Sequence, residues 1–283
     1  MAPHGSSNTP KKGDAPQGSA AQRREEQRAR LRKQREAEMR RQRTVRTIVI
    51  AAITVVALAA VAAIGYGIYA STRPKQAAPV VAPPGISKDT PYLTFGAPAD
   101  SGKPVVEIHL DFICPFCGEF EKAAGADIAE MAKNQEAQVH MVPRNFLDTF
   151  STTGDFSSRA ANTFVCAYAE DPNLALDVQK VLFENQPAEN SAGLTDEQLK
   201  DFAKQAGAGA KTLSCIDEQT YVPWVDQVAD PHGQKLKKGT PYVAINGKQM
   251  EKGYTKPGAL RQAVQAAGGG ASDAGGASDA GGS

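Results

Sequence analysis

The sequence predicts an α/β domain preceded by one transmembrane helix. Three observations support this: an uncharged apolar run at residues 47–70, a strand–helix–strand pattern after it, and a helix-rich stretch at about residues 150–235. Roughly 20 apolar residues cross a bilayer as a helix, so the first run is long enough. Within the expected domain, residues 92–267, the order of elements is βαβ, a helical insert and then ββα.

The βαβ unit is indicated by two kinds of periodicity. Strands are expected at residues 92–95, 105–110 and 138–144, and a helix between the last two reaches at least Met131. Its apolar residues recur at steps of three and four, which makes one buried stripe: Cys117, Phe120, Ala124, Ile128 and Met131. The two strands that flank this helix should therefore be parallel.

The rest of the domain is punctuated by proline and glycine. The helical insert is broken by Pro172, Pro187, Gly207 and Pro223 and contains no convincing strand. After it, strands are expected at residues 242–246 and near 249–252, with Gly247 as the turn, and a last helix at 257–267. These elements complete the ββα part of the domain.

The segments that flank the domain differ from it in composition. Residues 71–91 are rich in proline and are expected to be an extended tether between membrane and domain. Residues 268–283 repeat Gly, Ala, Ser and Asp, a composition that cannot form a core, so a disordered tail is expected there.

Charge is distributed unevenly, although the net charge is only +1. Residues 1–46 form a basic arm, and after the apolar run only Arg73 and Lys75 lie close by. Basic residues are retained on the cytoplasmic side, so we expect a single-pass signal anchor at residues 47–70 with the domain outside the cytoplasm. A cleaved signal peptide is the alternative, but its apolar region is usually about 7 to 15 residues.

The basic arm also attracts phosphate, so nucleic acid and anionic lipid are considered as partners. No aromatic residue stands between Met1 and Arg46 to stack on bases. We therefore expect no nucleic-acid partner, and weak adhesion to the inner leaflet remains an alternative.

The stretch with the clearest chemistry is Cys114-Pro115-Phe116-Cys117, which joins the second strand to the helix. A thiol at a helix N-terminus is shifted toward thiolate, the form that attacks disulfides. Cys114 is expected to be the nucleophile at the exposed end of the helix, and Cys117 the resolving thiol. Pro115 suits the first turn, where its missing N–H would be unpaired anyway.

The alternatives for this motif are half of a zinc site and an inert structural bridge. A structural zinc site needs four ligands. The other two cysteines form no second close pair, and the four histidines are scattered along the sequence: His4, His109, His140 and His232. We therefore expect redox chemistry at the motif, with no metal and no cofactor.

The number and position of the cysteines support export, because all four, an even number, follow the apolar run. Four cysteines permit three pairings, and pairing Cys114 with Cys117 leaves Cys166 with Cys215 for a structural disulfide. Two unpaired buried thiols are the alternative. Both residues lie in segments expected to be helical.

A C-x-x-C motif at a helix start, a helical insert, and Gly239-Thr240-Pro241-Tyr242 before a strand resemble the thioredoxin fold in its DsbA-like form. The resemblance covers roughly residues 92–267. It implies that Pro241 is cis and faces the active-site cysteines, and that the backbone of Thr240 binds an extended client peptide. An ordinary trans strand start is the alternative.

The whole arrangement is similar to exported thiol–disulfide oxidoreductases of high-GC Gram-positive bacteria. This resemblance implies that the protein oxidises cysteine pairs in secreted or cell-envelope client proteins. It also implies reoxidation by a membrane partner of the DsbB or vitamin-K-epoxide-reductase type.

The chain departs from the family pattern at two positions that affect how oxidising the cysteine pair is and how it exchanges protons. Strongly oxidising relatives often have His before the second cysteine, where this chain has Phe116, so a moderate oxidant is expected. Relatives also place a buried acid six residues before the nucleophile, where this chain has Ile108. Strand alternation points Glu107 and His109 to the opposite face, so either the strand contains a bulge or proton transfer runs through water, and Asp111 is a better acceptor than His109.

Three functions are therefore considered from the sequence. The first is an exported disulfide oxidase, and the second is a reductase or isomerase that uses the same cysteines. Exported isomerases usually carry a dimerisation domain, for which residues 71–91 are too few. The third, of another class, is a membrane-tethered binding module whose cysteine pair is structural.

Overall fold

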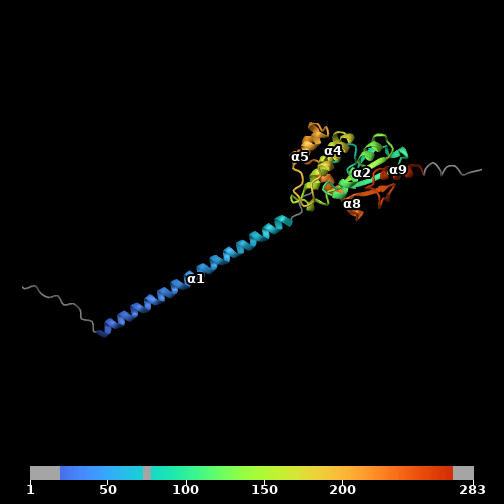
Figure 1. The fold of residues 1–283 in the computed structure, drawn as a ribbon. Helices are drawn as coiled ribbons and strands as arrows, with labels where there is room; N and C mark the ends of the chain where they lie inside the picture. The colour runs from blue at the N-terminus through green and yellow to red at the C-terminus, as the bar shows by residue number, and fades with distance from the viewer. Residues whose placement is uncertain (1–19, 73–77, 270–283) are drawn as a thin grey trace, which may run out of the picture. The chain divides into compact units, whose positions relative to one another are not determined.

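The computed structural model describes residues 20–72 and 78–269 (Figure 1). The chain divides into two compact units, Met1–Lys75 and Gln76–Ser283. The beginning of the expected basic arm, residues 73–77 of the expected tether and residues 270–283 of the expected tail lie outside the described residues.

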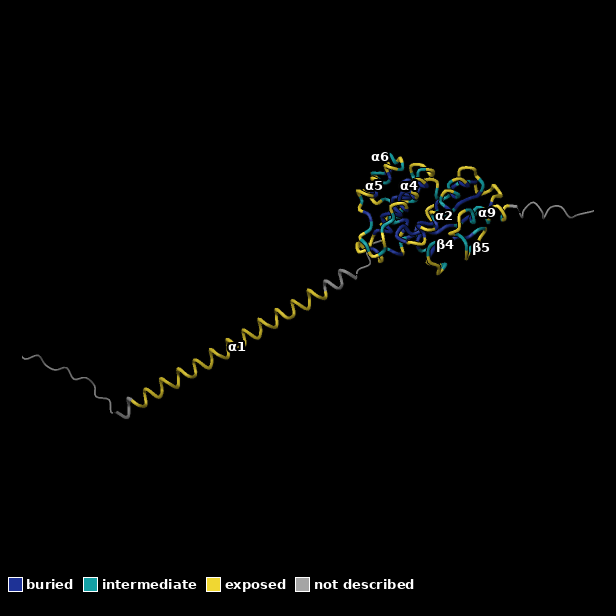
Figure 2. Tube along the Cα trace, in the orientation of Figure 1, coloured by how far each residue is buried: buried dark blue, intermediate teal, exposed yellow. Residues whose placement is uncertain are grey.

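The first unit contains one long helix, α1 (Ala20–Thr72). It runs without a break from the basic segment through the apolar run, because neither contains a proline or a helix-breaking cluster. Its described side chains are exposed along residues 24–65 (Figure 2). Among the described residues, α1 is the one helix long and apolar enough to cross a membrane, a property that signal sequences share.

The second unit is built on a five-stranded sheet with the order β1-β3-β2-β4-β5. Its strands are β1 (Leu93–Gly96), β2 (Val105–Leu110), β3 (Gln138–Pro143), β4 (Tyr242–Ile245) and β5 (Lys248–Gln249). β2 and β3 are parallel, and the other neighbouring pairs are antiparallel. The α/β class and the parallel βαβ unit are therefore confirmed.

The helix of that unit, α2 (Pro115–Lys133), buries the predicted apolar stripe. Phe120, Ile128 and Met131 are fully buried in the core of the second unit. The last helix, α9 (Ala259–Gly269), packs against α2 and begins two residues later than predicted. Pro257 and Gly258 form a turn instead, because Gly258 has a φ of +76°, which helical residues do not adopt.

The last two strands form a tighter hairpin than predicted. The strand expected near residues 249–252 is β5, which pairs with β4 directly after a two-residue turn. The turn residues Asn246 and Gly247 have φ values of 49° and 77°. Two successive positive φ angles are typical of a type I′ turn, for which Asn-Gly is a preferred sequence. The strand therefore starts earlier and the chain leaves the sheet after Gln249.

The helical insert lies between β3 and β4 in the chain. Its main helices are α3 (Phe156–Glu170), α4 (Pro172–Glu184), α5 (Asp196–Gln205) and α6 (Ala210–Glu218). Shorter pieces follow: α7 (Val222–Trp224), a π-helical turn η3 (Val225–Ala229) and α8 (Asp230–Lys235). α3 is buried along most of its length and packs against α4, α5 and α6. A disulfide between Cys166 and Cys215 joins α3 to α6.

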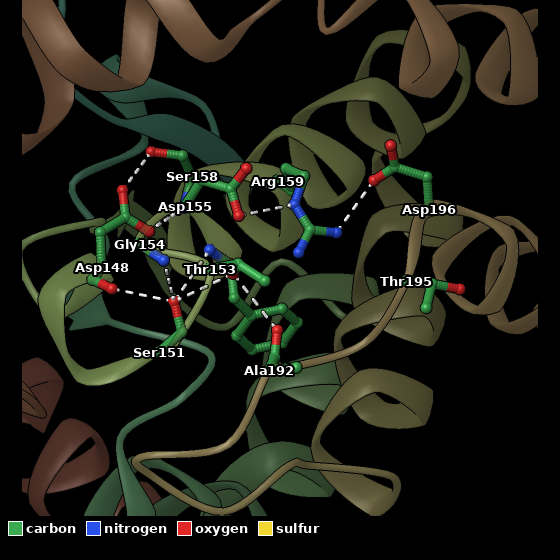
Figure 3. A network of polar contacts seen from close by, with 12 residues as sticks. Asp148, Ser151, Thr153, Gly154, Asp155, Ser158, Arg159, Ala192, Thr195 and Asp196 are labelled. Atoms are coloured by element: carbon green, nitrogen blue, oxygen red, sulfur yellow. Dashed lines mark hydrogen bonds and ion pairs between the residues drawn. The ribbon is translucent and has the colours of Figure 1, made fainter.

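Polar contacts fix the start of α3 to the loop after β3 (Figure 3). The carboxylate of Asp148 accepts hydrogen bonds from the main-chain N–H of Ser158 at 2.9 Å and from its hydroxyl at 2.5 Å. A carboxylate near a helix N-terminus satisfies N–H groups that have no partner within the helix. Arg159 contacts Asp155 at 3.1 Å and Asp196 at 2.9 Å, which ties α3 to the start of α5.

Candidate active site

The C-x-x-C motif lies at the start of α2, a few residues after the end of β2. Cys114 is the residue that caps α2, Pro115 occupies the first turn, and Cys117 lies within the helix. The main-chain N–H groups of Cys117 and Gly118 both donate to the carbonyl oxygen of Cys114, at 3.0 and 3.3 Å. Both cysteines are present as thiols, so the structure describes the dithiol form.

Cys114 is buried, which corrects the prediction that it lies at an exposed helix end. The residue is only 4% exposed, and Cys117 is 0% exposed. The chain at Thr240 and Pro241 covers it, since the Cys114 thiol donates to the Thr240 carbonyl oxygen at 3.3 Å. The peptide bond between Thr240 and Pro241 is cis. The prediction of an exposed Cys114 was wrong because the helix pattern alone carries no information about the segment at Thr240 and Pro241.

The environment lowers the pKa of the Cys114 thiol to about 6. The largest cause is a hydrogen bond from the thiol of Cys117, and burial opposes it. The hydroxyl of Thr240 and the main-chain N–H groups of Phe116 and Cys117 also stabilise the thiolate. At neutral pH the reduced site therefore holds Cys114 mainly as the nucleophilic thiolate.

The two polar groups of Thr240 act in opposite directions on Cys114. Its carbonyl accepts from the neutral thiol at 3.3 Å and so favours the protonated form. Its hydroxyl is buried without a conventional hydrogen-bond partner among the described residues, and it lowers the pKa of Cys114 by donating to the thiolate. In the ionised state the effect of the hydroxyl dominates, because a thiolate has no proton to give to the carbonyl.

Cys117 has the opposite character. Burial, followed by its hydrogen bond and charge interaction with Cys114, raises the pKa of the Cys117 thiol well above its ordinary value. The pair is thus polarised, with a nucleophilic thiolate at Cys114 and a protonated donor at Cys117. A polarised pair of this kind suits thiol–disulfide exchange, in which one sulfur is the nucleophile and the other stays protonated until it resolves the mixed disulfide.

A buried carboxyl group, that of Asp111, lies next to the pair. The main-chain carbonyl of Asp111 accepts from the N–H of Cys114 at 3.1 Å, and the residue is 0% exposed. Its carboxylate accepts from the Ser157 hydroxyl at 2.6 Å and from the N–H groups of Ile113 and Leu147 at 3.2 and 3.1 Å. Burial is the main cause that raises the pKa of Asp111 to about 7. A group with this pKa can both give and take a proton near neutral pH.

The position six residues before the nucleophile carries no acid in the folded chain. Ile108 is a fully buried core residue. β2 pairs with β3 without interruption from Val105 to Leu110, so β2 contains no bulge that would turn Glu107 or His109 toward the cysteines. These two residues hydrogen-bond to each other at 2.6 Å instead. The strand therefore contradicts the bulge that the sequence offered as one explanation.

Sequence reasoning missed Gln186, which follows α4. Its side-chain amide donates to the carbonyl oxygens of Cys114 at 2.8 Å and Phe112 at 3.1 Å, and so fixes the loop before α2. A Cβ atom on Gly118 would lie 2.3 Å from the Gln186 side-chain oxygen. A glycine inside a helix costs about 1 kcal/mol relative to alanine. A glycine at position 118, near the start of α2, was therefore the one sequence signal that another side chain packs tightly against this part of the helix.

Exposed aromatic side chains stand beside the buried pair. Phe116, between the cysteines, is 62% exposed, and Phe146 and Phe150 are also exposed. The loop that carries them is tied to the site by the hydrogen bond from the Leu147 N–H to Asp111. The Arg144 guanidinium lies 4.8 Å from the centre of the Phe146 ring. The site therefore offers apolar contacts around a polar reaction centre.

The disulfide between Cys166 and Cys215 is not part of this site. The two residues are 49 positions apart and both lie in the helical insert. The structure therefore separates the four cysteines into a reduced pair at the start of α2 and a bridge between α3 and α6.

The fold and the polarised cysteine pair beside a cis-proline define a thiol–disulfide oxidoreductase. The chain belongs to the thioredoxin family, because the family described as Thioredoxin (Thioredoxin_4) matches residues 93–266. The family match covers the sheet, the helix of the C-x-x-C motif and the helical insert.

Solved structures from several bacteria share this fold. Oxidised DsbA of Mycobacterium tuberculosis is 25% identical with a TM-score of 0.54, and the match covers 63% of this chain and 93% of that one. Reduced DsbG of the same species is 26% identical with a TM-score of 0.54, covering 63% and 88%. MdbA of Actinomyces oris shares the fold, with a TM-score of 0.54 at 21% identity over 69% of this chain and 96% of that one.

A curated relative is similar to this chain over part of its length. The serine/threonine-protein kinase PknE of Mycobacterium tuberculosis is 30% identical over 146 residues, which are 49% of this chain and 26% of the kinase. The match thus spans about a quarter of that protein's length. The similarity therefore concerns only part of the kinase.

Proposed function

We propose that this protein is an exported, membrane-anchored disulfide oxidase that acts through Cys114 and Cys117 on cysteine pairs of secreted or cell-envelope proteins. The observation that carries the proposal is the polarisation of the pair, with the pKa of Cys114 lowered to about 6 and that of Cys117 raised. Stabilising the Cys114 thiolate favours the dithiol over the disulfide, and a disulfide that is readily reduced is an oxidant.

The reaction begins with the disulfide form of the pair. A client thiolate attacks the sulfur of Cys114, the bond to Cys117 breaks, and Cys117 leaves as a thiolate that takes up a proton. A second client thiolate then attacks the client sulfur of the mixed disulfide and displaces Cys114. The client gains a disulfide, and the enzyme gains two electrons as a dithiol. The low pKa of Cys114 makes it a good leaving group in the last step.

Asp111 is the group in this proposal that exchanges the proton of Cys117. The carboxyl is buried beside the pair, and its pKa of about 7 lets it donate when Cys117 leaves and accept when Cys117 must attack. The proposal routes this transfer through water between the carboxyl and the thiol. Asp111 takes the role that an acid at position 108 would otherwise have.

Client binding is assigned to the chain at Thr240 and Pro241 together with the exposed ring of Phe116. An extended peptide can pair with exposed backbone next to a cis-proline, much as an added strand does. Thr240 lies against Cys114, so a bound peptide would present its cysteine to the reacting sulfur. The apolar side chains beside the site add contact area without selecting one sequence.

The proposal places residues 47–70 of α1 across the membrane and residues 1–46 in the cytoplasm. The single long apolar helix of the described residues supports an anchor, and the excess of Lys and Arg before it supports this orientation. Residues 71–91 would then tether the redox domain, residues 92–267, outside the cytoplasm. A membrane partner of the DsbB or vitamin-K-epoxide-reductase type would reoxidise the dithiol.

The proposal is tested by trapping. In cells, Cys117→Ala leaves Cys114 unable to resolve mixed disulfides, so client proteins should accumulate on it and be released by dithiothreitol. The matched control, Cys114→Ser with Cys117→Ala, should trap none. In unmodified protein the pair should be mostly oxidised. A mostly reduced pair with trapped clients supports a reductase, and no trapped clients at all supports a binding module; either result overturns the oxidase.

A further inference from the structure

A second cluster of titratable side chains lies on the sheet, away from the cysteines. Glu107 and His109 are two residues apart on β2 and so share the strand face opposite to Ile108. His232 of α8 lies against the same face. The three side chains come from positions that are up to 125 residues apart, and the fold brings them together.

The distances in this cluster are short. Nε2 of His109 lies 2.6 Å from Oε1 of Glu107, and Nε2 of His232 lies 3.1 Å from the same oxygen. All three donor atoms lie within 4.8 Å of one another. In a tetrahedral zinc site with bonds of about 2.0–2.1 Å, neighbouring ligand atoms are roughly 3.3 Å apart. The observed arrangement is therefore within small side-chain movements of such a site.

The ligand set suits zinc. Two imidazole nitrogens and one carboxylate oxygen are the ligands of many zinc centres, with a fourth position left to water. One carboxylate with two neutral imidazoles leaves a net charge of +1 on the bound ion, so part of its charge is neutralised. Cys114 and Cys117 are not needed, since the cluster supplies three ligands by itself.

The cluster combines one fixed ligand with two adjustable ones. His109 is 0% exposed, and its ring packs edge-on against Tyr242 with 4.9 Å between the ring centres. The side chains of Glu107 and His232 are 26% and 32% exposed, so they can adjust and an ion can enter from solvent. A fixed ligand and an entry path are both requirements for a metal site.

The surrounding charge permits a cation. The nearest buried positive group, Arg144, is neutralised by Asp230, with 2.5 Å between Nε and Oδ1. A third histidine, His140, is the register partner of Glu107 on β3. Its Nε2 is buried and has no hydrogen-bond partner within the part of the chain that the structure describes. Two histidines therefore contact the Glu107 carboxylate, and a third, His140, occupies the neighbouring register position on β3.

We infer that Glu107, His109 and His232 form a zinc-binding site, which is separate from the redox pair and lies next to Tyr242 of β4. The proposal goes beyond disulfide exchange and stands whether the protein is an oxidase or a reductase. It differs from a zinc site at the C-x-x-C motif, because its ligands are distant in sequence and only the fold unites them.

The test uses the full chain in detergent, free of any affinity tag, with the Cys114–Cys117 pair oxidised so that thiolates cannot bind the metal. Titration with ZnCl₂ in a calorimeter should show one strong equivalent, and Co²⁺ should give the visible absorption of a tetrahedral site. His232→Ala should weaken zinc binding at least about tenfold, because even partners that only orient a ligand cost that much. His4→Ala, which removes the remaining histidine of the chain, should bind as the unmodified protein does.

Glu107→Gln gives a second variant in case His232→Ala does not fold. It keeps the shape of the side chain but removes its charge, and it should also lose binding. Melting curves without metal show whether each variant is folded. Zinc should raise the melting temperature of the unmodified protein and of His4→Ala only. No binding by the oxidised chain, or binding that neither variant weakens, would show that the cluster is only a hydrogen-bonded network and would overturn the site.

Discussion

The thiol of Cys114 lies 3.3 Å from the carbonyl oxygen of Thr240, although 126 positions separate the two residues in the chain. This contact brings the start of α2 against the chain that leads into β4. It covers the reactive sulfur and places beside it the backbone to which we assign client binding. The residues that bury Cys114, the groups that stabilise its thiolate and the proposed client contact therefore lie together in the fold.

The reactivity of Cys114 should follow an unusually low pKa. Alkylation of the reduced protein by iodoacetamide should rise with a midpoint near pH 6 and level off above neutral pH, because only the thiolate reacts. Cys117→Ala should move the midpoint upward, since the Cys117 hydrogen bond is the largest cause of the low pKa. Rates against pH, followed by mass spectrometry, check both statements. A midpoint at the ordinary cysteine value in unmodified protein would contradict this view of the site.

Asp111→Asn should slow turnover by about a hundredfold, the lower end of the range for loss of proton transfer by a positioned side chain. The pKa of Asp111 is raised to about 7, so the pH profile of turnover in unmodified protein should bend near that value. The variant should lose the bend while keeping the low alkylation midpoint of Cys114. Stopped-flow measurement of reoxidation from pH 5 to 9 checks this. An unchanged profile would remove Asp111 from the mechanism.

Gly118→Ala should have opposite effects in two backgrounds. In unmodified protein the new methyl group meets the Gln186 oxygen, so Gln186 must move and give up its bonds to Cys114 and Phe112. Two lost hydrogen bonds of about 1 kcal/mol each outweigh the gain of about 1 kcal/mol from replacing a helical glycine. In the Gln186→Ala background the clash is absent, and the same change should stabilise. Urea unfolding of the four proteins measures both signs; stabilisation in both backgrounds would refute the packing argument.

Removal of the Cys166–Cys215 bridge should cost stability and leave the chemistry intact. A bridge that spans 49 positions restricts the unfolded chain by about 4 kcal/mol in the chain-entropy model. The double variant with alanine at both positions should therefore unfold at lower urea concentration, while the alkylation midpoint of Cys114 stays near pH 6. If that midpoint shifted toward the ordinary cysteine value, the bridge would be coupled to the active site.

Short-range patterns made much of the fold predictable. Two features of α2 follow from neighbours within a few residues: its apolar stripe and the proline in its first turn. The parallel pairing of β2 with β3 follows from the strand–helix–strand order. The predicted start of β5 was wrong because only Gly247 was taken as the turn. Asn246 and Gly247 together form a two-residue turn, so β5 begins at Lys248. The cis bond before Pro241 was expected from resemblance and could not be derived from the residues.

Long-range convergence was not predictable from the residues themselves. Gln186 lies 72 positions from Cys114 and carries no motif, yet it fixes the reactive loop. The histidines were interpreted as scattered, whereas His109 and His232 meet at Glu107 when the sheet and α8 pack together. Periodicity assigns a side chain to a face, but only the packing of that face decides what it meets.

The most direct test of the account is the reduction potential of the Cys114–Cys117 pair, measured by equilibration with glutathione. The low pKa of Cys114 stabilises the reduced form; this contribution is complete above the ordinary thiol pKa of 9.0 and vanishes as the pH falls through about 6. At pH 7 we predict a potential less negative than about −220 mV, as expected for a moderate oxidant. A value near that of thioredoxin, about −270 mV, would contradict the assignment as an oxidase.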